Sequence, residues 1–166
     1  MNKALEKLKI IQELCTRHNI KISTAESCTG GSVSKLITDQ SGSSDYYNGS
    51  IIAYSNEVKV NILKVPQEDI IKYGAVSEEV CEAMAINVKE KLGADWAIAI
   101  SGIAGPNGGS QDKPVGLVYI SISGPNNHIT NIKKLFNSTR NRIEIQTLSV
   151  NVCLNSLRLI LLSNSK

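Results

Sequence analysis

The sequence is poor in histidine, and its cysteines are not spaced as metal ligands usually are. His18 and His128 are the only histidines among 166 residues. The four cysteines form no Cys-x-x-Cys pair; they are Cys15, Cys28, Cys81 and Cys153. The sequence therefore predicts no zinc site and gives poor support to a Ser–His–Asp triad. Scattered single cysteines favour a reducing, cytoplasmic environment.

Aromatic residues and charge clusters are scarce as well. Aromatic residues make up 4% of the chain and hydrophobic residues 42%, so the expected core is mainly aliphatic. The formal charge of +3 is spread along the chain, which argues against a nucleic-acid partner. We see no signal-peptide core in residues 1–7 and no uninterrupted apolar run of membrane-spanning length. The expectation is a cytoplasmic protein with no membrane partner.

Apolar periodicity and turn residues divide the chain into alternating helices and strands. Helices are predicted over 3–18, 30–39, from Ser55, 66–73, 77–92 and 140–162, the last with Thr139 as its N-cap. Strands are predicted over 20–26, 46–54, 95–100, 114–122 and 128–136. We therefore expect an α/β fold, and the length suits one compact domain over residues 1–166.

The stretch Thr24–Gly31 is the most suggestive part of the chain. The pattern predicts a strand that ends there at small polar residues and is followed by a helix, which leaves backbone N–H donors free at the turn. Ser27 and Cys28 both lie at this turn and both qualify as nucleophiles. The alternatives are an ordinary strand–turn–helix joint and, for Cys28, a small core residue.

Four other features suit a ligand but also have plain explanations. The loop 39–45, with Ser43 and Ser44, is either a solvated turn or a phosphate-binding nest. Lys59 and the pair Arg140 and Arg142 are expected near helix starts, where the dipole disfavours cations. They are either solvent-facing or matched to a partner. The glycine-rich segment 101–110 follows a strand but fits neither a Walker A loop nor a Rossmann fingerprint.

Taken together, the motifs resemble the CinA C-terminal domain family across essentially the whole chain. They occur in family order and spacing: TAESCTGG at 24–31, GSS at 42–44, AYSNEVK at 53–59, GAVSEEV at 74–80, SGIAGPNGG at 101–109 and KPVG at 113–116. With this resemblance we expect a single three-layer α/β/α sandwich with a mixed sheet. The chain begins directly at this domain and so looks like the family's stand-alone form.

The resemblance implies roles for particular residues. Ser27 matches the family's proposed nucleophile, Lys59 its general base and Tyr54 a tyrosine of its active site. Ser101 stands where the family usually has threonine. Arg140 matches the arginine of a Gly-Asp-Arg segment. Here Ser138 and Thr139 replace the glycine and aspartate, and Glu144 stands where an arginine is common.

The resemblance also implies an activity. The family's typical reaction converts nicotinamide mononucleotide (NMN) and water to nicotinic acid mononucleotide and ammonia, with no cofactor and no metal. A homodimer is the family's habit. The residues expected to bind substrate are Thr29, Gly30, Gly31, Ser43, Ser44, Ser101, Gly102, Gly105, Gly108 and Arg140. The alternatives are a non-catalytic nucleotide-binding or competence/damage-associated module, and an amidohydrolase of another small amide.

Overall fold

The computed structural model describes residues 2–164 and is built around one five-stranded sheet. The strands are β1 (Ile22–Glu26), β2 (Tyr47–Ile52), β3 (Trp96–Gly102), β4 (Leu117–Ser123) and β5 (Ile129–Leu135). Their order in the sheet is β2-β1-β3-β4-β5. β1 runs parallel to both β2 and β3, whereas β4 and β5 continue antiparallel. The sheet is therefore mixed, as expected.

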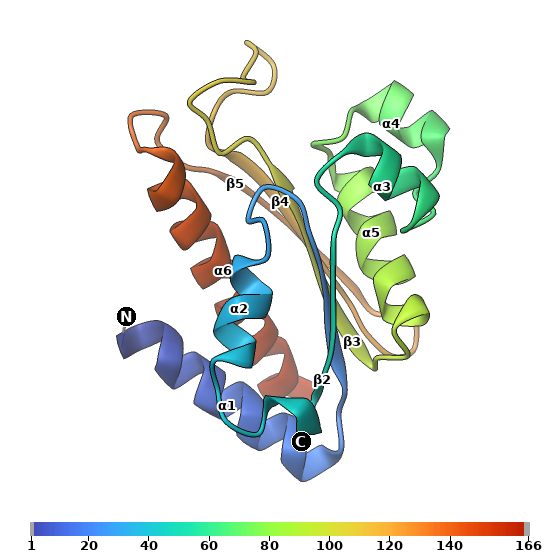
Figure 1. Cartoon of the computed structure of the whole chain (residues 1–166), viewed down its shortest axis with the longest axis vertical. Coiled ribbons are helices and arrows are strands. Elements are labelled where there is room, and N and C mark those ends of the chain that lie inside the picture. Colours follow the sequence, from blue (N-terminus) through green and yellow to red (C-terminus); the bar gives the residue numbers. More distant parts are fainter. Residues whose placement is uncertain (1, 165–166) are drawn as a thin grey trace.

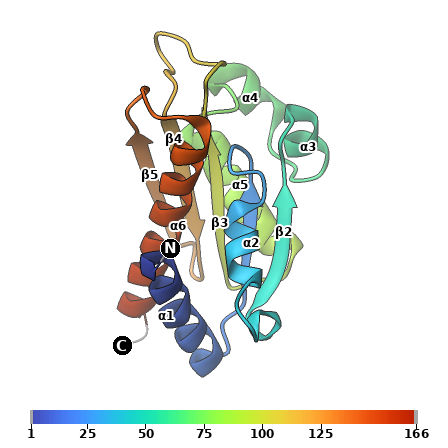
Figure 2. The same cartoon turned by 60° about the vertical axis from the view of Figure 1, so that its left-hand side comes forward.

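Helices cover both faces of the sheet, which confirms the predicted three-layer arrangement (Figures 1 and 2). One face carries α1 (Asn2–His18), α2 (Ser32–Thr38) and α6 (Arg142–Asn164). The other face carries α3 (Asn56–Asn61), α4 (Gln67–Tyr73) and α5 (Glu78–Lys91). A single 3-10 turn, η1 (Ser43–Asp45), precedes β2.

The two faces of β3 show how the sequence builds the two apolar layers. Successive strand residues point to opposite faces of a sheet. Ile98 and Ile100 join the core under α1 and α6, whereas Ala97 and Ala99 join the smaller core under α5. Small alanines on that face leave room for the helix that packs there.

The start of α6 differs from the sequence prediction. The helix begins at Arg142 and not at 140, and Asn141 rather than Thr139 caps it. The Asn141 side chain accepts from the Glu144 N–H at 3.0 Å, and the Glu144 carboxylate accepts from the Asn141 N–H at 2.9 Å. This reciprocal pair is a capping box. It also gives Glu144, the departure from the family pattern, a structural role.

Among the described residues, α6 is the one helix long and apolar enough to cross a membrane by length and composition. A core helix passes the same test, so this is weak evidence for a membrane span. Cys153, Leu154 and Leu157 of α6 are fully buried in the core that the helix shares with α1. The helix therefore serves as a packing element of this fold.

Candidate active site

Ser27 lies just beyond the carboxyl end of β1, next to the end of β3. Its N–H donates to the Ile100 carbonyl at 3.0 Å, which continues the pairing between the two strands for one residue past β1. Its side chain is almost buried, with 8% exposed. In open α/β sheets, the carboxyl ends of parallel strands are the usual place for a ligand site.

Lys59 comes from α3 and ends on Ser27. The Ser55 hydroxyl caps the helix by accepting from the Val58 N–H. The Lys59 side chain is only 2% exposed, and its Nζ lies 3.0 Å from Ser27 Oγ and 2.8 Å from the Ala53 carbonyl. Burial lowers the pKa of Lys59 because the apolar surroundings disfavour the charged amine.

The Lys59 amine has no carboxylate to stabilise its charge. The one side-chain ion pair within residues 2–164 joins Lys35 and Asp39. A neutral amine has two N–H donors and one lone pair, so it can donate to the Ala53 carbonyl while accepting the Ser27 hydroxyl proton. The arrangement thus suits a general base beside its nucleophile.

Cys28, the rival nucleophile, is in a poor environment for thiolate chemistry. Its side chain is 5% exposed, and burial raises the pKa of the thiol to about 12. The thiol therefore stays protonated near neutral pH. The Cys28 carbonyl accepts from the Gln146 amide of α6 at 2.8 Å, which fixes the turn from the helix side.

Glu26 is the functional-site residue that the sequence reasoning missed. Its fully buried carboxylate accepts from the Thr29 hydroxyl at 2.7 Å and from the N–H groups of Gly31, Val33 and Ser34 at 2.7–3.1 Å. The helix N-terminus expected to receive a substrate anion therefore already holds the protein's own anion. Its position, an acidic residue a few positions before a predicted helix, was the sequence signal that could have indicated this role.

The backbone N–H groups of this turn are thus not all free, as the sequence pattern predicted them to be. The Gly31 N–H is bonded to Glu26, and the Gly30 N–H donates to the Ser27 carbonyl at 3.1 Å. Gly30 and Gly31 instead line a separate hollow between α2 and α6. Within residues 2–164, the N–H groups of Cys28 and Thr29 donate to no backbone carbonyl.

A cavity of about 260 Å³ opens beside Ser27 and Lys59. Of the predicted site residues, Ser27, Lys59, Tyr54, Ser101, Gly102, Gly105 and Gly108 line it. Lys59 and Arg142 are the charged residues along its described wall, and no carboxylate lines it. Burial lowers the pKa of Lys59, whereas a guanidinium stays charged, so Arg142 is the permanent charge of this cavity.

Arg142, and not Arg140, reaches the cavity. Its Nη2 donates to the Tyr54 hydroxyl at 2.6 Å and its Nη1 to the Gly105 carbonyl at 2.9 Å. Arg140 precedes α6, is exposed, and does not line the cavity. The Asn141-x-x-Glu144 capping box, had it been read from the sequence, would have placed Arg142 as the first helical residue.

Ser43 and Ser44 lie away from this cavity. They belong to η1, which precedes β2, and Lys21 ahead of β1 donates to the Asp45 carbonyl of the same turn. Because β1 and β2 are parallel, η1 lies at the end of the sheet opposite Ser27; it is the teal turn at the bottom of Figure 1. The structure therefore places Ser43 and Ser44 apart from the cavity that holds Ser27 and Lys59.

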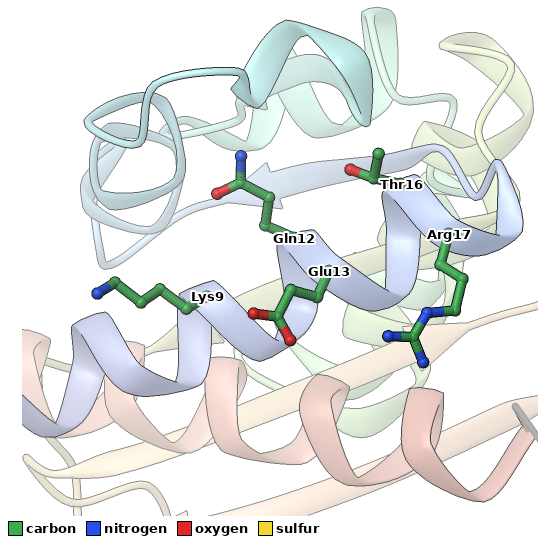
Figure 3. A pocket seen from close by; sticks show the side chains of 5 residues that line it. All are labelled: Lys9, Gln12, Glu13, Thr16 and Arg17. Atoms are coloured by element: carbon green, nitrogen blue, oxygen red, sulfur yellow. The ribbon is translucent and has the colours of Figure 1, made fainter.

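Two other hollows lack the chemistry of the Ser27 cavity. One, of about 520 Å³, contains His18 and His128 at the sheet end opposite Ser27. The other is lined by polar side chains along α1, shown in Figure 3: Lys9, Gln12, Glu13, Thr16 and Arg17. No group of three or more potential metal ligands occurs within the described residues.

The fold and site together define a three-layer α/β domain organised around a buried serine–lysine pair. Comparison with known proteins then gives the family: the chain belongs to the CinA C-terminal domain family, whose model matches residues 4–161.

Two curated relatives named "CinA-like protein" show how far the likeness extends. The relative from Prochlorococcus marinus strain AS9601 is 76% identical over 95% of this chain, and the one from Nostoc punctiforme is 46% identical over 93%. The chain spans 37% of the length of each of these relatives.

Two solved structures share the fold over nearly their whole length. The competence/damage inducible protein CihA from Agrobacterium tumefaciens is 33% identical, with a TM-score of 0.92 over 96% of this chain and 95% of that one. The competence or damage-inducible protein from Enterobacter asburiae is 29% identical, with a TM-score of 0.90 over 95% of this chain and 98% of that one.

Proposed function

We propose that this CinA-family domain is an NMN amidohydrolase that uses Ser27 as its nucleophile and Lys59 as its general base. The observation that carries the proposal is the 3.0 Å contact between Lys59 Nζ and Ser27 Oγ inside an apolar layer. A serine hydroxyl is a weak nucleophile until a base takes its proton. Burial without a carboxylate partner lowers the pKa of Lys59, which favours the neutral amine that a general base requires.

In the proposed reaction, neutral Lys59 accepts the Ser27 proton while Oγ bonds to the carboxamide carbon. The N–H groups of Cys28 and Thr29 stabilise the oxyanion, each donor being worth about 3 kcal/mol of barrier. The C–N bond breaks, Lys59 returns the proton to the leaving nitrogen, and ammonia departs. Water activated by Lys59 then hydrolyses the Ser27 ester and releases the carboxylate.

The charge of the cavity supports an anionic substrate such as NMN. Arg142 uses two of its five N–H donors on neutral oxygens of Tyr54 and Gly105, so others remain for a phosphate. No carboxylate along the described wall competes for the guanidinium. We therefore assign the substrate phosphate to Arg142 in place of Arg140.

The test is incubation of the purified protein with NMN, following ammonia and nicotinic acid mononucleotide together. Stoichiometric release that disappears in Ser27→Ala and persists in Cys28→Ala supports the proposal. Cys28→Ala is the matched control because it removes the neighbouring nucleophile from the same turn. Loss of release in Cys28→Ala alone would instead assign the chemistry to the thiol.

The names of the solved relatives favour a second candidate, a non-catalytic nucleotide-binding module tied to competence or DNA damage. Calorimetric binding of NMN without ammonia release would support this module. Release from a different small amide, with none from NMN, would keep the Ser27–Lys59 chemistry and change the substrate. The cytoplasmic location and the homodimer stay predictions for fractionation and light scattering.

A further inference from the structure

Lys113 bridges two loops that both belong to the cavity wall. It lies in the loop between β3 and β4, which lines the wall with Ile103, Ala104, Gly105, Asn107 and Gly108. Its Nζ donates to the Tyr73 carbonyl and, at 2.7 Å, to the Val76 carbonyl in the connection between α4 and α5. We call residues 73–76, the last residue of α4 and the three that follow it, the strap. Ala75 and Val76 of the strap line the same cavity as Ser27.

Side chains engage every carbonyl of the strap. Between the two carbonyls bound by Lys113, the Gly74 carbonyl accepts from the Ser77 hydroxyl at 2.8 Å. The Ala75 carbonyl accepts from the buried Ser101 hydroxyl at 2.8 Å. Tyr73 ends α4 and the Gly74 N–H donates to the Ile70 carbonyl at 2.9 Å, but beyond that point the strap belongs to no helix or strand, so these side chains fix its path.

The position of Lys113 also depends on the glycine of the strap. Gly74 has φ of +80°, and a Cβ built on it would lie 2.7 Å from Lys113 Nζ. A side chain at position 74 would therefore displace the lysine. Lys113 contacts no carboxylate, so its charge is stabilised by backbone carbonyls alone within the described residues.

We propose that Lys113 is a positioning residue that sets substrate affinity by holding the strap against the Ser27 cavity. Lys113 is not among the residues that line the cavity, so it acts through Ala75 and Val76. The Ser27–Lys59 contact involves neither the strap nor Lys113. Loss of Lys113 therefore weakens substrate binding and leaves the chemical step in place. The kinetic part of this inference rests on the proposed NMN amidohydrolase function.

The test compares Lys113→Met with Lys89→Met. Lys89 is a matched control because it also donates to a backbone carbonyl, that of Gly124 at 2.8 Å, and does not line the cavity. Hydrogen bonds from charged groups are strong, so we expect Lys113→Met to raise KM for NMN about tenfold or more, with kcat nearly unchanged. Lys89→Met should leave both constants unchanged.

A second measurement needs no activity. Backbone order parameters from ¹⁵N relaxation should fall for residues 74–77 in Lys113→Met and stay at the wild-type level in Lys89→Met. Unchanged order parameters with an unchanged KM would overturn the role of Lys113. A wild-type protein that releases no ammonia would defeat the amidohydrolase proposal, while the order parameters would still decide whether Lys113 holds the strap.

Discussion

At the scale of single residues, Lys59 links the proposed chemistry to stability. Its pKa is lowered in the folded protein by burial, whereas in the unfolded chain it has the ordinary value of about 10.4. Between these two values the unfolded state binds more protons than the folded state. The free energy of unfolding therefore rises with pH across that window. Below the lowered pKa, both states are protonated and the penalty of burying the charge is complete.

We therefore expect the wild-type protein to gain stability relative to Lys59→Met as pH rises through that window. Urea unfolding at a series of pH values measures the difference. Lys9→Met is the matched control, because Lys9 is exposed on α1 and its side chain extends from the helix surface in Figure 3. Stability curves for wild type and Lys59→Met that stay parallel would show that Lys59 does not have a lowered pKa.

Arg142 and Arg140 give a second prediction at this scale. If Arg142 holds the substrate phosphate, Arg142→Gln should raise KM for NMN about tenfold or more, because a charged hydrogen bond is lost. Arg140→Gln should leave KM unchanged. Nicotinamide riboside lacks the phosphate, so its weaker turnover should be insensitive to Arg142→Gln. The opposite pattern, with Arg140→Gln raising KM, would return the phosphate to the residue that the family motif indicated.

At the scale of elements, Glu26 joins β1 to α2. One buried carboxylate accepts one hydroxyl and three backbone N–H groups around the turn that carries Ser27. Glu26→Gln replaces one carboxylate oxygen by an NH₂ group, which cannot accept from the N–H and hydroxyl donors around it. We therefore expect the free energy of unfolding to fall by about 3 kcal/mol. The displaced turn should also lower kcat. Thermal and urea unfolding measure the first effect, and a loss below about 0.5 kcal/mol would contradict the capping role.

The element scale also shows where sequence reasoning succeeds. The helix starts predicted at Ser55 and Ser77 are confirmed, and both serines cap their helices by accepting from the backbone N–H three residues on. Such caps depend on neighbours in the chain, so local sequence carries the information. Residues 114–116 were predicted as strand, but β4 begins at Leu117. Val115 packs against Gly105 and Gly109 of the glycine-rich segment, and Gly116 lies against Phe136 just beyond β5. That packing is not local.

At the scale of the whole molecule, the helix and strand pattern with the family resemblance predicted the three layers, but not the strand order. Lys59 and Ser27 are 32 residues apart, and the pattern alone did not bring them together; the family resemblance did. The proximity of Tyr54 to Arg142, 88 residues away, depends on how α6 starts against the β2–α3 connection. Long-range contacts of this kind depend on packing, which a single sequence does not display.

The division into two apolar layers allows stability and site to be tested separately. Ile11 of α1 is fully buried in the core shared with α6, whereas Lys59 belongs to α3, which lies on the same side of the sheet as α5. Ile11→Ala removes buried methyl and methylene groups and leaves a cavity, so it should lower the free energy of unfolding by about 3 kcal/mol. Because the cavity wall contains no residue of α1, kcat and KM of the folded protein should stay at wild-type values.

Glu13→Ala on the exposed side of the same helix is the control and should change stability little. Urea unfolding and steady-state kinetics on the same samples decide the matter. A changed KM in fully folded Ile11→Ala would contradict this separation, because it would show that packing under α1 affects the site across the sheet.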